Sequence, residues 1–291
     1  MLHYSGAVYR PPSEAHSLII QVTVGCSHNK CAFCNMYKAK QFAITPEEQV
    51  LSDLRWAREQ YAHVERFFLA DGDALILPTE RLLGILRTIR ELFPECRRIS
   101  TYASPKSILK KMPEELAALR AAGLEFAYLG LESGNDALLK KINKGVTAAQ
   151  QIEAGQKLKS AGFTLSVTAI NGLAGSNGDW QAHAKDTAAA LNAMRPDFIA
   201  LLTLRIYTGT PMAEWIERGE LVMPTPMELI RESKLFLEHI DCPGAVFRSN
   251  HASNYLALAG TLNEDRARLI RQCEDALAGN APLRKYVELG R

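Results

Sequence analysis

Three cysteines close together in the chain could hold a metal ion or an iron–sulfur cluster. The segment Gly25-Cys26-Ser27-His28-Asn29-Lys30-Cys31-Ala32-Phe33-Cys34 has the spacing C-x4-C-x2-C. Three thiolates on one loop can ligate three irons of a [4Fe–4S] cube, which usually takes four cysteines. The remaining iron would keep an open coordination position, and open positions on metals are where substrates bind and react.

The alternative occupant of this loop is zinc, held by the three cysteines and His28. Structural zinc sites commonly close a tetrahedron with two C-x2-C pairs or a pair of histidines, whereas this loop has a single C-x2-C pair. His28 also lies inside the loop that its co-ligands would form. Iron is therefore the preferred interpretation, and a zinc-stabilised binding protein or an iron–sulfur electron carrier is the competing class.

The other cysteines, Cys96, Cys242 and Cys273, are isolated and are expected to fill space. The N-terminal segment has no signal pattern, because Pro11-Pro12 and Glu14 interrupt any apolar run. No apolar stretch approaches the roughly 20 residues that a membrane span needs. We therefore expect a cytoplasmic protein with no membrane partner, in a compartment where clustered thiols serve metals or redox chemistry rather than disulfides.

The composition is that of an ordinary globular protein. The chain has 291 residues, of which 47% are hydrophobic and 23% charged, enough to bury a large core. Lysine and arginine number 34 against 32 acidic residues, a net charge of +2. This balance argues against a nucleic-acid partner attracted by the overall field of the protein.

Short β-rich runs alternate with amphipathic segments from Leu18 onward. Several runs are almost continuously apolar, as is typical of parallel strands covered on both faces. The expected strands are Leu18–Val24, Val64–Ala70, Arg98–Tyr102, Glu125–Leu131, Thr164–Ile170 and Phe198–Leu204. The expected helices are Pro46–Tyr61, Thr79–Phe93, Pro113–Ala122, Thr147–Ala161, Trp180–Met194 and Pro211–Arg218.

Six such βα units, joined by right-handed crossovers, predict an α/β fold in the form of a partial (βα)6 TIM-like barrel. Residues 1–17 are expected to be an N-terminal extension and residues 18–219 the barrel core. Residues 220–291 are expected to form a small C-terminal helical cap. Helices over Thr225–Ile240 and Asn263–Ala278 would flank a short strand near Ala245–Phe247 in this cap.

Polar, glycine and sulfur side chains follow the expected strands. In parallel α/β folds the reactive residues lie at the carboxyl ends of the strands, so these positions are the expected site. They are Gly25-Cys26, Asp71-Gly72-Asp73, Ala103-Ser104, Glu132-Ser133-Gly134, Asn171-Gly172 and Arg205-Ile206-Tyr207. Acids there could also cap the following helix, and Arg205 or Tyr207 could simply pack against the wall.

A three-cysteine loop after the first strand of such a series resembles the radical S-adenosylmethionine (SAM) superfamily. The usual spacing in that family is C-x3-C-x2-C, so this chain carries one extra residue between Cys26 and Cys31. Phe33 occupies the place of the aromatic residue that the family often has before the third cysteine. The resemblance implies that Cys26, Cys31 and Cys34 bind a [4Fe–4S] cluster.

Further segments resemble motifs of the same family, in the elongator-type and coproporphyrinogen-oxidase-like branch. Asp71-Gly72-Asp73 resembles the glycine-glycine-glutamate motif that meets the amino group of SAM, with Asp73 as the acid. The other matches are Gly130-Leu131-Glu132-Ser133-Gly134, the basic stretch that ends near Lys144, Ile170-Asn171-Gly172 beside the adenine and ribose, and Gly209-Thr210-Pro211-Met212. Together these matches cover about Leu18 to Met212.

The resemblance implies an enzyme in which one electron from the cluster cleaves SAM to methionine and a 5′-deoxyadenosyl radical. A flavodoxin or ferredoxin-type protein would supply the electron, and the substrate would be a small molecule or a peptide. Transfer of another part of SAM is a further possibility. The expected cofactor contacts are Phe33, Gly72, Asp73, Ser104, Glu132, Lys144 and Asn171.

The candidate substrate contacts are Arg205, Tyr207 and His251. His251 belongs to a polar segment of the tail, Phe247 to Tyr255, which lies between apolar runs and could equally be a surface loop. An imidazole can exchange a proton near neutral pH, which makes His251 a candidate acid or base.

Overall fold

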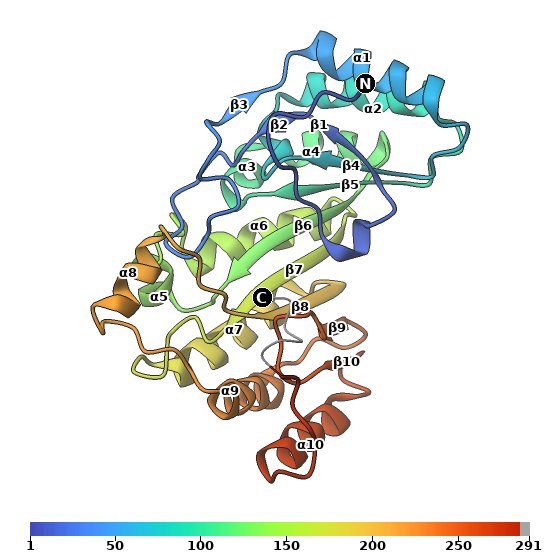
Figure 1. The fold of residues 1–291 in the computed structure, drawn as a ribbon. Coiled ribbons are helices and arrows are strands. Elements are labelled where there is room, and N and C mark those ends of the chain that lie inside the picture. The colour runs from blue at the N-terminus through green and yellow to red at the C-terminus, as the bar shows by residue number, and fades with distance from the viewer. Residues whose placement is uncertain (286–291) are drawn as a thin grey trace. The chain divides into compact units, whose positions relative to one another are not determined.

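The computed structural model describes residues 1–285, which form two compact units. The first unit comprises Met1–Asn29, Asn35–Leu129 and Lys157–Leu165. The second comprises Lys30–Cys34, Gly130–Gln156 and the chain from Ser166 onward. Each unit contains strands and helices in alternation (Figure 1), as the α/β prediction expects.

Parallel strands form the centre of the first unit. β1 (Leu18–Gln21) pairs with β4 (Arg66–Ala70), β4 with β5 (Arg98–Ala103), and β5 with β6 (Leu124–Glu132). β4 is completely buried from Phe67 to Ala70, because helices and loops cover both of its faces. The carboxyl ends of β1, β4 and β5 therefore lie at one edge of this sheet.

Helices of the first unit follow the strands along the chain. They are α1 (Glu47–Gln60), α2 (Thr79–Leu92), α3 (Pro105–Lys110) and α4 (Pro113–Ala121), with 3-10 turns at Pro12–Glu14 and Ala74–Ile76. α1 and α2 lie side by side (Figure 1). A small antiparallel pair, β2 (Thr23–Val24) and β3 (Ala43–Ile44), flanks the cysteine loop on both sides along the chain.

The strands of the second unit continue the βα pattern. β7 (Thr164–Asn171) pairs in parallel with β8 (Phe198–Thr203), and β8 pairs in parallel with β9 (Val246–Ser249). β10 (Leu258–Thr261) runs antiparallel to β9. The helices are α5 (Asp136–Lys141), α6 (Ala148–Ser160), α7 (Trp180–Met194), α8 (Pro211–Glu217), α9 (Pro226–His239) and α10 (Arg266–Leu277).

Most predicted elements are present, and the differences are concentrated in short segments and in the tail. The short helices α3 and α5 were not predicted, because six residues contain too little periodicity to be recognised. The tail contributes two strands rather than one, and α9 packs between α7 and α10 (Figure 1). Within residues 1–285, no helix is both long and apolar enough to span a membrane.

Candidate functional site

The cysteine loop begins in the first unit and passes through the second. Cys26 follows β2 and Gly25, whose φ of 74° is in the left-handed region that suits glycine. Cys31 and Cys34 form a turn in which the Cys34 N–H donates to the Cys31 carbonyl at 3.3 Å. All three cysteines are partly exposed and none is in a disulfide.

Backbone hydrogen bonds hold the second part of this loop. The Ala32 N–H donates to the Ile142 carbonyl at 2.8 Å, and the Met212 N–H donates to the Ala32 carbonyl at 3.1 Å. Phe33, a predicted cofactor contact, packs partly buried against the hydrophobic cluster that contains Ala32, Ile142 and Met212. The turn that carries Cys31 and Cys34 is thus anchored at the end of α5 and the start of α8.

Gly72 packs directly against Cys26. A Cβ at this position would lie 2.8 Å from the Tyr37 ring, closer than Cβ atoms approach other atoms, and 3.2 Å from the Cys26 Cβ. The Gly72 N–H also donates to the Gly25 carbonyl at 3.1 Å. Only glycine therefore allows the end of β4 to lie this close to the first cysteine.

The neighbouring carboxylate of Asp73 is fully buried and accepts hydrogen bonds from serine hydroxyl groups. Oδ2 accepts from Ser27 Oγ at 2.6 Å, Ser104 Oγ at 2.9 Å and Ser107 Oγ at 2.5 Å, and Oδ1 accepts from the Ser104 N–H at 3.2 Å. Ser104 is also the N-cap of α3. Asp73 and Ser104, both predicted cofactor contacts, thus link β4, β5 and the cysteine loop.

Glu132 and Lys144 form a nearly buried ion pair in the second unit. Lys144 Nζ lies 2.9 Å from Glu132 Oε1, and the two side chains are 12% and 13% exposed. Glu132 has a φ of 64°, and a Cβ on Gly130 would lie 2.2 Å from its carboxylate. The strand-end motif therefore brings together the two predicted SAM contacts of opposite charge.

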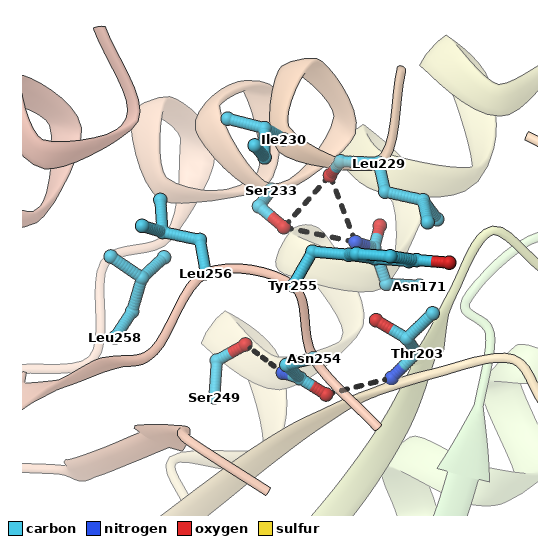
Figure 2. A pocket seen from close by; sticks show the side chains of 10 residues that line it. All are labelled: Asn171, Thr203, Leu229, Ile230, Ser233, Ser249, Asn254, Tyr255, Leu256 and Leu258. Carbon is cyan, nitrogen blue, oxygen red and sulfur yellow. Dashed lines mark hydrogen bonds between the residues drawn. The ribbon is translucent and has the colours of Figure 1, made fainter. Parts of the chain in front are cut away.

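Asn171, at the carboxyl end of β7, lines a small recess with Thr203, Ser233 and Tyr255 (Figure 2). Its Nδ2 donates to the Leu229 carbonyl and to Ser233 Oγ, each at 2.9 Å. Its Oδ1 is buried with no hydrogen-bond partner within residues 1–285. The amide nitrogen of Asn171 thus donates to residues of α9. Its amide oxygen is the atom that could accept a hydrogen bond from a cofactor.

The candidate substrate contacts lie near the carboxyl ends of β8 and β9. Arg205 follows β8, and His251 follows β9. Burial, then the positive charges of Arg205 and Arg284, lower the pKa of His251. Arg284 donates to the His251 carbonyl at 2.8 Å. The structure thus brings Arg205 and His251 into one basic region, whereas Tyr207 is 38% exposed.

A buried network behind the strand ends was not predicted. His183 Nε2 donates to the Ile170 carbonyl at 2.9 Å, so its Nδ1 accepts from Ser133 Oγ at 2.8 Å. The Gly172 N–H donates to Glu232 Oε1 at 2.8 Å. Burial lowers the pKa of His183 to about 4 and raises the pKa of Glu232 to about 8. These two side chains lie on helices, where the strand-end rule gives no signal.

Asp71, one of the predicted strand-end positions but not one of the predicted cofactor contacts, is fully buried beside the cysteine loop. Its Oδ2 accepts from the Gly25 N–H at 2.8 Å and from Lys40 Nζ at 2.7 Å. Within residues 1–285, no three His, Cys, Asp or Glu side chains are gathered as a metal site. Since Cys26 and the other two cysteines belong to different units, the three-cysteine ligand set stays a prediction.

Comparison with known proteins identifies a family. The family model described as the Radical SAM superfamily matches residues 20–187. The heme chaperone HemW of Mycobacterium tuberculosis is 27% identical over 207 residues, which cover 67% of this chain and 51% of HemW. This chain therefore spans about half the length of that curated relative.

Solved structures show the same fold. Coproporphyrinogen III oxidase (HemN) from Escherichia coli has a TM-score of 0.56 at 17% identity, covering 76% of this chain and 52% of HemN. The radical SAM methyltransferase TsrM from Kitasatospora setae, with cobalamin and a [4Fe–4S] cluster bound, has a TM-score of 0.55 at 20% identity. That match covers 69% of this chain and 39% of TsrM. These likenesses confirm the predicted partial-barrel α/β fold; the C-terminal cap and its boundaries stay predictions.

Proposed function

This chain belongs to the radical SAM superfamily, whose cofactors are a [4Fe–4S] cluster and SAM, and we propose that it is an enzyme that modifies a small-molecule or peptide substrate. The observation that carries the proposal is the loop inside the family match with three partly exposed cysteines, none of which is in a disulfide. Cysteine thiolates are the donors that iron–sulfur clusters take.

The residues around the loop fit a bound cluster. Cys26, Cys31 and Cys34 would hold three irons, and Gly72, where a Cβ would meet the Tyr37 ring, lets the end of β4 lie close to Cys26. When bound, the cluster and SAM supply one-electron chemistry that amino-acid side chains cannot perform. The protein's own part is to bind, orient and exclude water.

We assign the binding of SAM to the strand-end residues. The Glu132–Lys144 pair offers both a carboxylate and an ammonium, which suit the amino and carboxylate groups of an amino acid. Asn171 Oδ1 offers an acceptor. Arg205 and His251 are proposed to contact the substrate, and a flavodoxin or ferredoxin-type protein is the proposed electron donor.

The test is anaerobic reconstitution with iron and sulfide, followed by reductant and SAM. We expect a brown protein that forms 5′-deoxyadenosine, and loss of that product in Cys34→Ala. Cys96→Ala is the matched control, because Cys96 is buried outside the loop and should retain product formation. A colourless protein with one zinc per chain contradicts the proposal. A product that contains another part of SAM would show instead that the enzyme transfers that group.

A second candidate, favoured by the likeness to a heme chaperone, is the binding of heme without catalysis. Titration with heme, followed by its visible absorbance, tests this role in the same preparation. Tight heme binding together with no 5′-deoxyadenosine under reducing conditions would favour the carrier over the enzyme.

A further inference from the structure

Asp71 links the two sides of the cysteine loop in the first unit. Its Oδ2 accepts from the N–H of Gly25, the residue before Cys26. The same oxygen accepts from Lys40 Nζ, and Lys40 lies beyond Cys34 in the chain. Gln21 Nε2 at the end of β1 is a third donor, at 2.8 Å. One carboxylate oxygen thus connects β1, β4 and both sides of the loop.

The pair that Asp71 forms with Lys40 is shielded from water. The two side chains are 0% and 8% exposed, and their charged atoms are 2.7 Å apart. A buried ion pair loses much of its hydration, so removing one partner leaves the other charge uncompensated. The geometry of Lys40 and Gly25 is therefore tied to the presence of the Asp71 charge.

Asn29, in the four-residue stretch between Cys26 and Cys31, connects this stretch to the segment that follows Cys34. Its φ of 45° is in the left-handed region, which asparagine tolerates better than most residues. Its Nδ2 donates to the Tyr37 carbonyl at 2.8 Å, and Lys38 Nζ donates to the Asn29 carbonyl at 2.9 Å. The extra residue between Cys26 and Cys31 is thus accommodated in a segment whose backbone is held in place.

We propose that Asp71, through its ion pair with Lys40, is a positioning residue that fixes the cysteine loop and thereby its hold on the iron–sulfur cluster. This inference rests on the proposed function. The Asp71 carboxylate is not a ligand in it: its hydrogen bonds orient the backbone on both sides of the cysteines. The extra residue of the loop and Asp71, which stands where the glycine-glycine-glutamate motif has its first glycine, are then parts of one arrangement.

The test compares Asp71→Asn and Lys40→Met with Glu14→Gln. Asp71→Asn keeps the shape and an acceptor oxygen but removes the charge. Glu14 is the matched control, because it is a fully buried carboxylate in the same unit that lies outside the cysteine loop. Its partner is Arg98, and the nitrogen and oxygen of this ion pair are 2.5 Å apart. Two quantities are measured: amide hydrogen exchange of residues 25–29 and 35–40 in the cluster-free chain, and iron release to a chelator after reconstitution.

We expect both loop variants to exchange these amides at least about tenfold faster and to retain iron about 10–100-fold less tightly, the range seen when residues that orient metal ligands are removed. Lys40→Arg should restore retention, and Glu14→Gln should match the wild type in both measurements. Retention of iron at the wild-type level in Asp71→Asn and Lys40→Met overturns the inference, whatever the exchange rates.

Failure of the proposed function gives a different result. A wild-type chain that assembles no iron–sulfur cluster overturns both the proposed function and this inference. A wild-type chain that assembles one, with variants that hold it equally well, overturns the inference alone. Lys40→Gln removes the charge of the pair but keeps a hydrogen-bond donor for Asp71, so it is the milder variant should the other two fail to fold. Retention of iron at the wild-type level in Lys40→Gln would count against the inference.

Discussion

Glu232 and His183 are buried residues that contact the backbone at the carboxyl end of β7. Glu232 Oε1 accepts from the backbone of Gly172, next to Asn171, and lies 3.5 Å from His183 Nε2. Both side chains are almost completely buried, so each favours its uncharged form. Burial raises the pKa of the Glu232 carboxyl group to about 8.

This burial predicts a pH dependence of stability. Because the pKa of Glu232 rises from 4.5 to about 8 on folding, its contribution is full below pH 4.5 and is lost as the pH rises through 8. His183, with its pKa lowered from 6.5 to about 4, contributes fully above pH 6.5 and less as the pH falls toward 4. Between about pH 4.5 and pH 6.5 the effects of Glu232 and His183 on stability oppose each other. Above pH 6.5 only the effect of Glu232 changes with pH.

Glu232→Gln should remove the loss of stability that ionisation of Glu232 causes at alkaline pH. As the pH rises from 6.5, the unperturbed pKa of His183, to about 8, the pKa of Glu232, the free energy of unfolding of the variant should increase by about 2 kcal/mol relative to that of the wild type. Urea unfolding at the two ends of this interval measures it. A stability difference that does not change with pH would show that Glu232 is ionised in the folded chain.

At the scale of elements, the loop after β9 is attached to β8 by one side chain. Asn254 Nδ2 donates to the Leu201 carbonyl at 2.8 Å, and its Oδ1 accepts from the Thr203 N–H at 3.0 Å. These bonds lie beyond the β8–β9 pairing, which ends at Ala200 and Arg248. The position of the segment with His251 therefore depends on Asn254 as well as on Arg284.

Asn254→Ala should destabilise the protein by about 1–3 kcal/mol, because it leaves a buried N–H and a buried carbonyl without partners. Asn254→Asp should also destabilise, because it keeps the acceptor for Thr203 but sets a buried carboxylate oxygen against the Leu201 carbonyl. Asn250→Ala, at an exposed position of the same loop, is the control and should change stability by less than about 0.5 kcal/mol. Chemical denaturation measures all three, and equal effects at positions 250 and 254 would refute the assignment.

At the scale of the whole molecule, the family relationship covers the strands and helices from residue 20 to residue 187. The described chain beyond residue 187 contains β8, α8, α9, β9, β10 and α10. Glu232, His251 and Arg284 all lie in this part. We therefore expect substrate preference to depend on this part of the chain more than on the matched part.

Binding of SAM should stabilise the whole reconstituted chain by mass action. At a SAM concentration one hundred times Kd, the expected gain is about 2.7 kcal/mol, seen as a higher melting temperature. The cluster-free chain is the control and should gain less, because the open iron position is missing. An equal gain without the cluster would mean that SAM binds to the polypeptide alone.

The sequence by itself determined the kind of chemistry and the order of the elements. Clustered thiols and continuous apolar runs such as Phe67–Ala70 are local properties, readable from residue type and spacing. Only the tertiary structure decided which polar groups share one buried space: Asp71 with Lys40, Asp73 with three serines, and Glu232 with Gly172. The physical reason is desolvation: whether a charge is paired and dry depends on contacts between residues far apart in the chain, which no local pattern specifies.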